Sequence, residues 1–123
     1  MSKTYTLSAT SQVIDASNTV LAKTDSGGSD NSITQRVSDE IQIPNGSTDL
    51  LVSLDGLTAK YVHLKFTGGA ISVKLNSNAN TAISITPSAS VPGVLLIAGG
   101  SITALYVSNS SGSTVTLERT LAS

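Results

Sequence analysis

The chain contains few residues of the kinds that catalyse reactions or bind metal ions. His63 is the only histidine, and cysteine is absent. Zinc sites need several imidazole or thiolate ligands, and nucleophilic triads need a histidine that a carboxylate orients. Alternation places His63 on a polar strand face between Tyr61 and Lys65, which indicates a solvent-facing residue rather than a ligand. We therefore expect no metal site and no cofactor.

The eight acidic residues are dispersed along the chain, and most of them fall at expected turns. Two carboxylates brought together by folding could hydrolyse a glycosidic bond. Such sites also use aromatic platforms for sugar rings, and this chain has no tryptophan and 3% aromatic residues. We therefore predict that the protein is not an enzyme. The scarcity of aromatic residues disfavours the alternative interpretation, a small hydrolase.

Residues 25–31 are rich in oxygen ligands, with the sequence Asp-Ser-Gly-Gly-Ser-Asp-Asn. They lack the twelve-residue spacing and terminal bidentate glutamate of an EF-hand calcium loop. Their glycines do not follow a strand and open a helix, so a phosphate cradle is unsupported. We interpret residues 25–32 as a flexible, solvated loop.

Two charged residues fall on strand faces that alternation would bury. Asp39 shares a face with the apolar residues of segment 37–43, and Arg119 with those of segment 115–121. A buried charge without a partner is costly. Both residues could lie at sheet rims, a β-bulge could reset the register near Asp39, or Arg119 could donate to an ion pair within or between subunits.

The elements that would position these residues are short β-strands, because alternation recurs every second residue and no helical periodicity does. In segment 61–66, Val62, Leu64 and Phe66 share one face. Segment 71–75 has the same pattern, and residues 67–70 join the two as a predicted β-hairpin. Further strands are expected at 4–14, 18–24, 33–43, 49–54, 82–86, 93–98, 101–108 and 113–121.

Turns punctuate these segments at short intervals. Pro44-Asn45-Gly46 and Asp55-Gly56 are strong turn signals, and Gly99-Gly100 is predicted to join strands 93–98 and 101–108 as a hairpin. The Asn-x-Ser sequences at Asn45 and Asn109 are interpreted as turn residues. Roughly eight to ten short strands with regular turns indicate an all-β, antiparallel sandwich of jelly-roll type. We expect one domain over residues 1–123, with residues 1–24 forming either an N-terminal arm or its first strands.

Composition excludes several classes of partner. Charged residues make up 12% of the chain, and the net charge is −1. Without a basic stripe we expect no nucleic-acid binding and no attraction to an anionic membrane. The first five residues lack the apolar stretch of a secretion signal, and the longest apolar run, residues 94–98, is too short to cross a bilayer.

Segments 94–98 and 102–107 are apolar on both faces. A two-layer sandwich normally leaves its outer faces polar, so either a loop or N-terminal arm of the same chain covers these residues or another subunit does. The candidate interface residues, together with the arginine discussed above, are Val94, Leu95, Leu96, Ile97, Ile102, Leu105, Tyr106, Val107 and Arg119.

Three segments carry a family resemblance: residues 61–65, 71–76 and, above all, 94–112. In the last, a glycine-rich turn precedes Ile102-Thr103-Ala104-Leu105 and then Ser108-Asn109-Ser110-Ser111-Gly112. This half of the chain resembles small β-sandwich structural proteins of tailed bacteriophages, which serve as capsid decoration, head-fibre, neck or tail components. The first sixty residues carry no such likeness.

The resemblance implies a non-enzymatic structural subunit of a bacteriophage virion, with a capsid decoration or auxiliary protein as the favoured role. We expect partners to be like subunits in a homo-oligomer, such as a trimer, and other virion structural proteins. Assembly would take place in the host cytoplasm and would depend weakly on salt. The alternative is a carbohydrate- or receptor-binding module of a tail or fibre that uses the face of Tyr61, His63 and Lys65.

Overall fold

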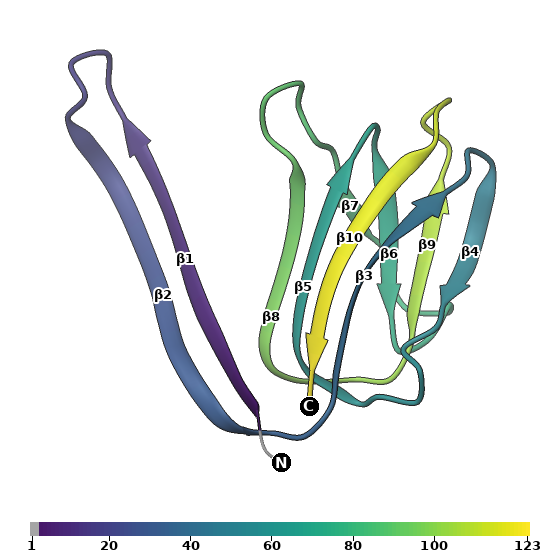
Figure 1. Ribbon diagram of the computed structural model, residues 1–123. Helices are drawn as coiled ribbons and strands as arrows, with labels where there is room; N and C mark the ends of the chain where they lie inside the picture. Colours follow the sequence, from purple (N-terminus) through teal and green to yellow (C-terminus); the bar gives the residue numbers. More distant parts are fainter. Residues whose placement is uncertain (1–2) are drawn as a thin grey trace. The chain divides into compact units, whose positions relative to one another are not determined.

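The computed structural model describes residues 3–123, which form ten β-strands and, within that range, no helix (Figure 1). The predicted all-β fold is confirmed. The strands are β1 (Lys3–Ile14), β2 (Val20–Ile33), β3 (Arg36–Ile43), β4 (Ser47–Val52), β5 (Ala59–Thr67), β6 (Ile71–Leu75), β7 (Ile83–Ile85), β8 (Gly93–Ile102), β9 (Leu105–Asn109) and β10 (Val115–Ala122).

The chain divides into two compact units, with the boundary after Thr34. The first contains β1 and β2, and the second contains β3 to β10. We expected one sandwich over residues 1–123, whereas the sandwich occupies residues 35–123. Of the segment proposed as an arm or first strands, residues 1–24, the first two lie outside the described residues, and residues 3–24 are part of a longer hairpin whose second strand ends at Ile33.

The first unit is a two-stranded antiparallel hairpin, called the N-terminal hairpin below. Its register runs from Tyr5 opposite Asp30 to Val13 opposite Ala22. Asp15 shapes the turn, because its Oδ1 accepts hydrogen bonds from the Ser17 and Thr19 amides at 2.8 and 2.9 Å.

The prediction of a flexible loop at residues 25–32 is wrong, because they lie in β2 and pair with β1. Their serine, glycine and aspartate content is typical of loops. A long partner strand nevertheless satisfies their backbone groups, so pairing outweighs local propensity. Gly27 and Gly28 lie in this strand without positive φ angles.

The second unit is a sandwich of two four-stranded antiparallel sheets, ordered β3-β10-β5-β8 and β4-β9-β6-β7 (Figure 1). Both sheets supply the core, since burial of apolar side chains between the layers stabilises the fold. The first sheet contributes Val62, Leu64, Phe66, Val115, Leu117 and Leu121, and the second contributes Val52, Ile71, Val73, Leu105 and Val107. The inward faces predicted for segments 61–66 and 71–75 are confirmed, although Leu75 is only partly buried.

The pairing of consecutive strands differs from the prediction. β5 and β6 belong to different sheets, as do β8 and β9, so neither predicted hairpin forms. Within residues 35–123, β6 and β7 are the one pair of consecutive strands that share a sheet. Alternation reports which face a side chain occupies but not which strand lies beside it, so the face assignments hold and the pairings fail.

Gly99 and Gly100 form a bulge inside β8 instead of a hairpin turn. Tyr61 pairs with Ala98 and Ala59 with Ile102, so three residues of β8 lie opposite one residue of β5. Gly99 has a φ of 80°, a conformation that costs glycine little. The strand therefore continues to Ile102 before the chain crosses to the other sheet.

The other two turn predictions are confirmed. The Ser47 amide donates to the Pro44 carbonyl at 3.3 Å, and the Leu57 amide donates to the Leu54 carbonyl at 2.9 Å. Asp55 and Gly56 both have positive φ, as a type I′ turn requires.

Candidate interaction site

The N-terminal hairpin has one polar face built from cross-strand hydrogen bonds. Thr4 Oγ1 donates to Asn31 Oδ1 at 3.1 Å, and Thr10 Oγ1 donates to Asp25 Oδ1 at 2.7 Å. Between them the hydroxyl oxygens of Thr6 and Ser29 lie 3.5 Å apart. Paired hydroxyls and amides of this kind hold the two strands in register and present a surface that water solvates.

The opposite face of the hairpin carries apolar side chains together with Ser11, Thr24, Ser26 and Asp30. Tyr5, Leu7, Ala9 and Val13 project from β1 on this side, and their partners on β2 are small apart from Asp30. Leu7 lies opposite Gly28, where a Cβ atom would meet nothing within 4 Å. The Leu7 side chain itself is half-buried.

The end of the hairpin near its turn carries a cluster of exposed aliphatic side chains. Val13, Ile14, Val20 and Leu21 are 59%, 46%, 51% and 64% exposed. A two-stranded hairpin is marginally stable in water, and unpaired strand edges readily accept another chain. This apolar end therefore makes the N-terminal hairpin a candidate binding element.

A second candidate surface lies on β8, an edge strand whose one neighbour is β5. Val94, Leu96 and Ala98 lie on the outer side of the sheet, opposite Lys65, His63 and Tyr61 of β5. Val94 is 50% exposed, Ala98 is exposed and Leu96 is half-buried. These three apolar residues are called the β8 strip.

The predicted interface residues do not form one surface. Ile102, Leu105 and Val107 are buried in the core, and Leu95 and Ile97 pack against it. The prediction that these five residues contact another subunit is therefore wrong, because the opposite sheet of the same chain covers them. Segment 94–98 is apolar on both faces, so alternation alone could not show which face of β8 is buried.

Of the remaining predicted residues, Val94 and Leu96 lie on the β8 strip, whereas Tyr106 lies on the outer face of the other sheet. Tyr106 pairs with Leu51 of β4 and with Lys74 of β6. Lys74 forms an ion pair with Asp49 at 3.0 Å on this face. The outer surface around Tyr106 is thus partly charged, as is the surface beside the β8 strip, where Lys65 lies opposite Val94.

Arg119 forms an ion pair inside the chain, one of the alternatives that the sequence left open. Its side chain is 3% exposed, and Nε lies 2.6 Å from Asp39 Oδ1. Hydrogen bonding from Arg119 lowers the pKa of Asp39, burial opposes this shift, and the charge of Arg119 adds to the lowering. Because both sheets enclose Arg119, its prediction as an interface residue is also corrected.

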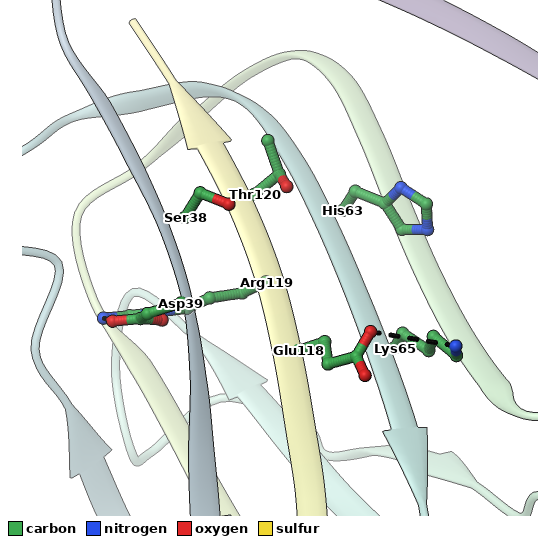
Figure 2. Close-up of a pocket in the computed structure, with 7 residues that line it drawn as sticks. All are labelled: Ser38, Asp39, His63, Lys65, Glu118, Arg119 and Thr120. Carbon is green, nitrogen blue, oxygen red and sulfur yellow. Dashed lines mark hydrogen bonds and ion pairs between the residues drawn. The ribbon is translucent and has the colours of Figure 1, made fainter.

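A polar hollow of about 300 Å³ lies over the sheet of β3, β10 and β5 (Figure 2). Its lining comprises Ser38, Asp39, His63, Lys65, Glu118, Arg119 and Thr120. Lys65 and Glu118 form an ion pair at 3.7 Å, and His63 lies across from Thr120. Over residues 3–123 no group of three or more acidic or histidine residues is placed to hold a metal ion.

The expectations from the sequence do not include the N-terminal hairpin as a binding element. The signal was nevertheless present, because Tyr5, Leu7 and Ala9 alternate with Thr4, Thr6 and Ser8. Such alternation, in a strand that pairs with a polar strand, is typical of a hairpin with one apolar and one polar face.

Comparison of the chain with protein-family models, with curated proteins and with solved structures found no match. In the part of the chain that the structure describes, no helix has the length and hydropathy needed to cross a membrane.

Proposed function

We propose that this protein is a non-enzymatic structural subunit that assembles through protein–protein contacts as a homo-oligomer. The observation that carries the proposal is the N-terminal hairpin. Over the described residues, its strands of 12 and 14 residues pair with each other alone and leave a group of aliphatic side chains exposed near the turn. A ribbon of this length has too little core of its own to be stable, so contact with another chain would stabilise it.

We further propose that the sandwich is of jelly-roll type. In support, the strands of the sandwich pair from the ends of its sequence inward, β3 with β10, β4 with β9 and β5 with β8. Successive pairs alternate between the two sheets. An arrangement of eight strands in two four-stranded sheets with crossing connections fits two Greek keys. Capsid and lectin domains are among the proteins that use this architecture.

The virion role of the subunit, as a capsid decoration or auxiliary protein, is proposed from the phage-like pattern of residues 60–123. The chain's low charge supports contacts made by apolar area and main-chain hydrogen bonds. Such contacts suit a permanent assembly better than an encounter steered by charge. Other virion structural proteins would be the remaining partners.

Solution mass tests the proposal. Light scattering of the wild-type protein should give a multiple of the chain mass, and a Val13→Ser, Leu21→Ser double variant should shift the mass toward one chain. A Thr6→Ser, Ser29→Thr variant alters the polar face conservatively and should assemble like the wild type. A wild-type mass of one chain at high protein concentration would refute the proposal.

A carbohydrate- or receptor-binding module is the second candidate function, and the polar hollow beside His63 is the observation that favours it. Lys65, Glu118 and His63 could form hydrogen bonds with sugar hydroxyls. Against this, the hollow's lining contains no tryptophan, tyrosine or phenylalanine on which a sugar ring could stack. A glycan array should therefore give no hits, and binding that His63→Ala abolishes would favour the module instead.

A further inference from the structure

We infer that Asn45-Gly46 is a site of spontaneous modification, deamidation through a succinimide, which the fold suppresses until the end of the sandwich around Asn109 opens. It is the one Asn-Gly pair in the chain. Asparagine is a thermolabile residue, and a following glycine has no Cβ atom to shield the nitrogen that attacks it. The inference does not depend on the proposed function.

The reaction joins groups of two adjacent residues. The Gly46 backbone nitrogen loses its proton and attacks Asn45 Cγ, so that a new C–N bond closes a five-membered ring. The bond from Cγ to Nδ2 then breaks, and the departing amino group takes up a proton and leaves as ammonia. Water opens the ring at either carbonyl and gives aspartate or isoaspartate. The chain and water therefore supply every reactant.

The exposure of this pair would by itself make the site reactive. Asn45 and Gly46 are both exposed. They are the central residues of the turn between β3 and β4, in which the Ser47 amide donates to the Pro44 carbonyl at 3.3 Å. Gly46 has a φ of 90°, as the third residue of a type II turn requires. Water therefore reaches both reacting residues at the surface.

The attacking nitrogen, however, is engaged in a short hydrogen bond. The Gly46 amide donates to the Asn109 carbonyl at 2.7 Å. Loss of the amide proton would leave this carbonyl without its donor and would place negative charge against its oxygen. Because Asn109 is fully buried, water does not readily replace the donor. The hydrogen bond therefore disfavours the first step of the reaction.

The attacked group is held as well, with an effect of the opposite sign. Asn45 Oδ1 accepts a hydrogen bond from the Gly112 amide at 2.9 Å, and this donor would stabilise the negative charge that attack places on Oδ1. Water supplies a similar donor in an unfolded chain, so the net gain is small. Attack cannot begin while Gly46 keeps its proton, so protection outweighs activation.

The side chain of Asn109 fixes the protecting carbonyl in place. Its Nδ2 donates to the Ile43 and Ser113 carbonyls at 2.9 and 2.8 Å. Ser47, which follows the turn, pairs with Asn109 across β4 and β9. Release of the Gly46 amide therefore requires local opening of this end of the sandwich, and the reaction rate reports how often such opening occurs.

Peptide mapping of protein incubated in mildly alkaline buffer tests the inference. Trypsin releases residues 37–60, in which Asn45 is the only asparagine, so the mass of one peptide reports its conversion to a carboxylate. Native protein should react at least about tenfold more slowly than protein unfolded in guanidinium chloride, because the native turn must first open. Equal rates would overturn the inference, since exposure alone would then set the reactivity.

A Gly46→Ala variant, measured in the unfolded state, tests the chemical route. The added methyl group shields the backbone nitrogen and should slow the reaction severalfold. An unchanged rate would mean that water hydrolyses the side-chain amide directly, and the inference would fail.

Two further variants locate the opening that controls the native rate. Asn109→Ala removes both anchoring hydrogen bonds and should raise the native rate about tenfold. Arg119→Met is the matched control, because it destabilises the sandwich through Asp39 and through Ser53, which lies at the far end of β4 from the turn. It should change the native rate less than about twofold. Equal acceleration by both variants would overturn the role of Asn109.

Circular dichroism verifies that each variant folds. Should Asn109→Ala fail to fold, Ser111→Ala takes its place, because it removes only the 2.7 Å hydrogen bond from Ser111 Oγ to Asn109 Oδ1. It should accelerate the native reaction more than Arg119→Met does, and the reverse order would overturn the inference.

Discussion

Arg119 on β10 lies directly opposite Asp39 on the edge strand β3, and its guanidinium donates to both oxygens of that carboxylate, from Nε at 2.6 Å and from Nη2 at 3.1 Å. Nη1 donates to the Ser53 carbonyl at 2.6 Å, just after β4 of the other sheet. One buried side chain therefore connects β10, β3 and the end of β4, and it satisfies its charge inside the chain.

Replacement of Arg119 should destabilise the sandwich. Removal of one partner of a buried ion pair costs about 3–5 kcal/mol. Because the Asp39 side chain is 42% exposed and can be solvated, we expect a smaller loss for Arg119→Met, about 1–3 kcal/mol. Urea unfolding measures it. The matched control is Glu118→Gln, which breaks the exposed pair with Lys65 and should cost less than about 1 kcal/mol; equal losses for the two variants would contradict this account.

The same pair should make stability depend on acid pH. The pKa of Asp39 is lowered in the folded state, so its contribution is fully present above its ordinary pKa of about 4 and is lost as the pH falls through the lower folded value. Stability of the wild type should therefore fall below about pH 4 more steeply than that of Asp39→Asn. Unfolding free energies measured along an acid series check this, and parallel curves would refute it.

Asn109 should matter as a buried connector of strand ends. Fully buried at the end of β9, its Nδ2 donates to the Ile43 and Ser113 carbonyls at 2.9 and 2.8 Å, and its Oδ1 accepts from the Ser111 amide at 3.0 Å. Asn109→Ala removes these hydrogen bonds and should cost about 2–4 kcal/mol, since each unsatisfied buried group costs about 1–3 kcal/mol.

Asn45→Ala provides the control for Asn109. The Asn45 side chain accepts one hydrogen bond from the Gly112 amide, in an exposed turn. Its removal should cost about 1 kcal/mol or less. Thermal unfolding of the two variants should separate them clearly, and a loss for Asn45→Ala as large as that for Asn109→Ala would contradict the role assigned to the buried amide.

The assembly should be insensitive to salt. Screening shortens the range of charge interactions from about 10 Å at 0.1 M to about 3 Å at 1 M ionic strength, and it leaves apolar contacts intact. The expected contact surfaces are aliphatic, so sedimentation velocity should give the same oligomer over that range. Dissociation at moderate ionic strength would indicate that ion pairs, rather than apolar area, hold the subunits together.

The sequence predicted which face of each of these strands is buried, because alternation is a local property of a segment. Leu64 and Val73 were assigned inward from their own segments, and both are fully buried. For Arg119 the sequence left a sheet rim and an ion pair within or between subunits open, and the structure shows the pair within the chain, since a cation on an apolar face must find an anion or remain unfavourably buried.

Strand partners could not be predicted in the same way. A glycine pair such as Gly99-Gly100 fits a hairpin turn and a bulge equally, and the choice depends on β5, which lies some forty residues earlier. The prediction of a loop at residues 25–32 was wrong for a similar reason, because their extended conformation depends on pairing with β1 and not on their own propensities. The N-terminal hairpin was not predicted as a binding element, because its apolar residues are few and form a surface only once the strands pair and place them on one face.

Amide hydrogen exchange in β1 and β2 at several protein concentrations tests the central claim most directly. If a second chain covers the N-terminal hairpin, its amides should exchange slowly at high concentration and rapidly on dilution, while those of the buried strands β5 and β10 stay protected throughout. Exchange in the hairpin that is rapid at every concentration, or slow to the same degree in a monomer, would contradict the claim.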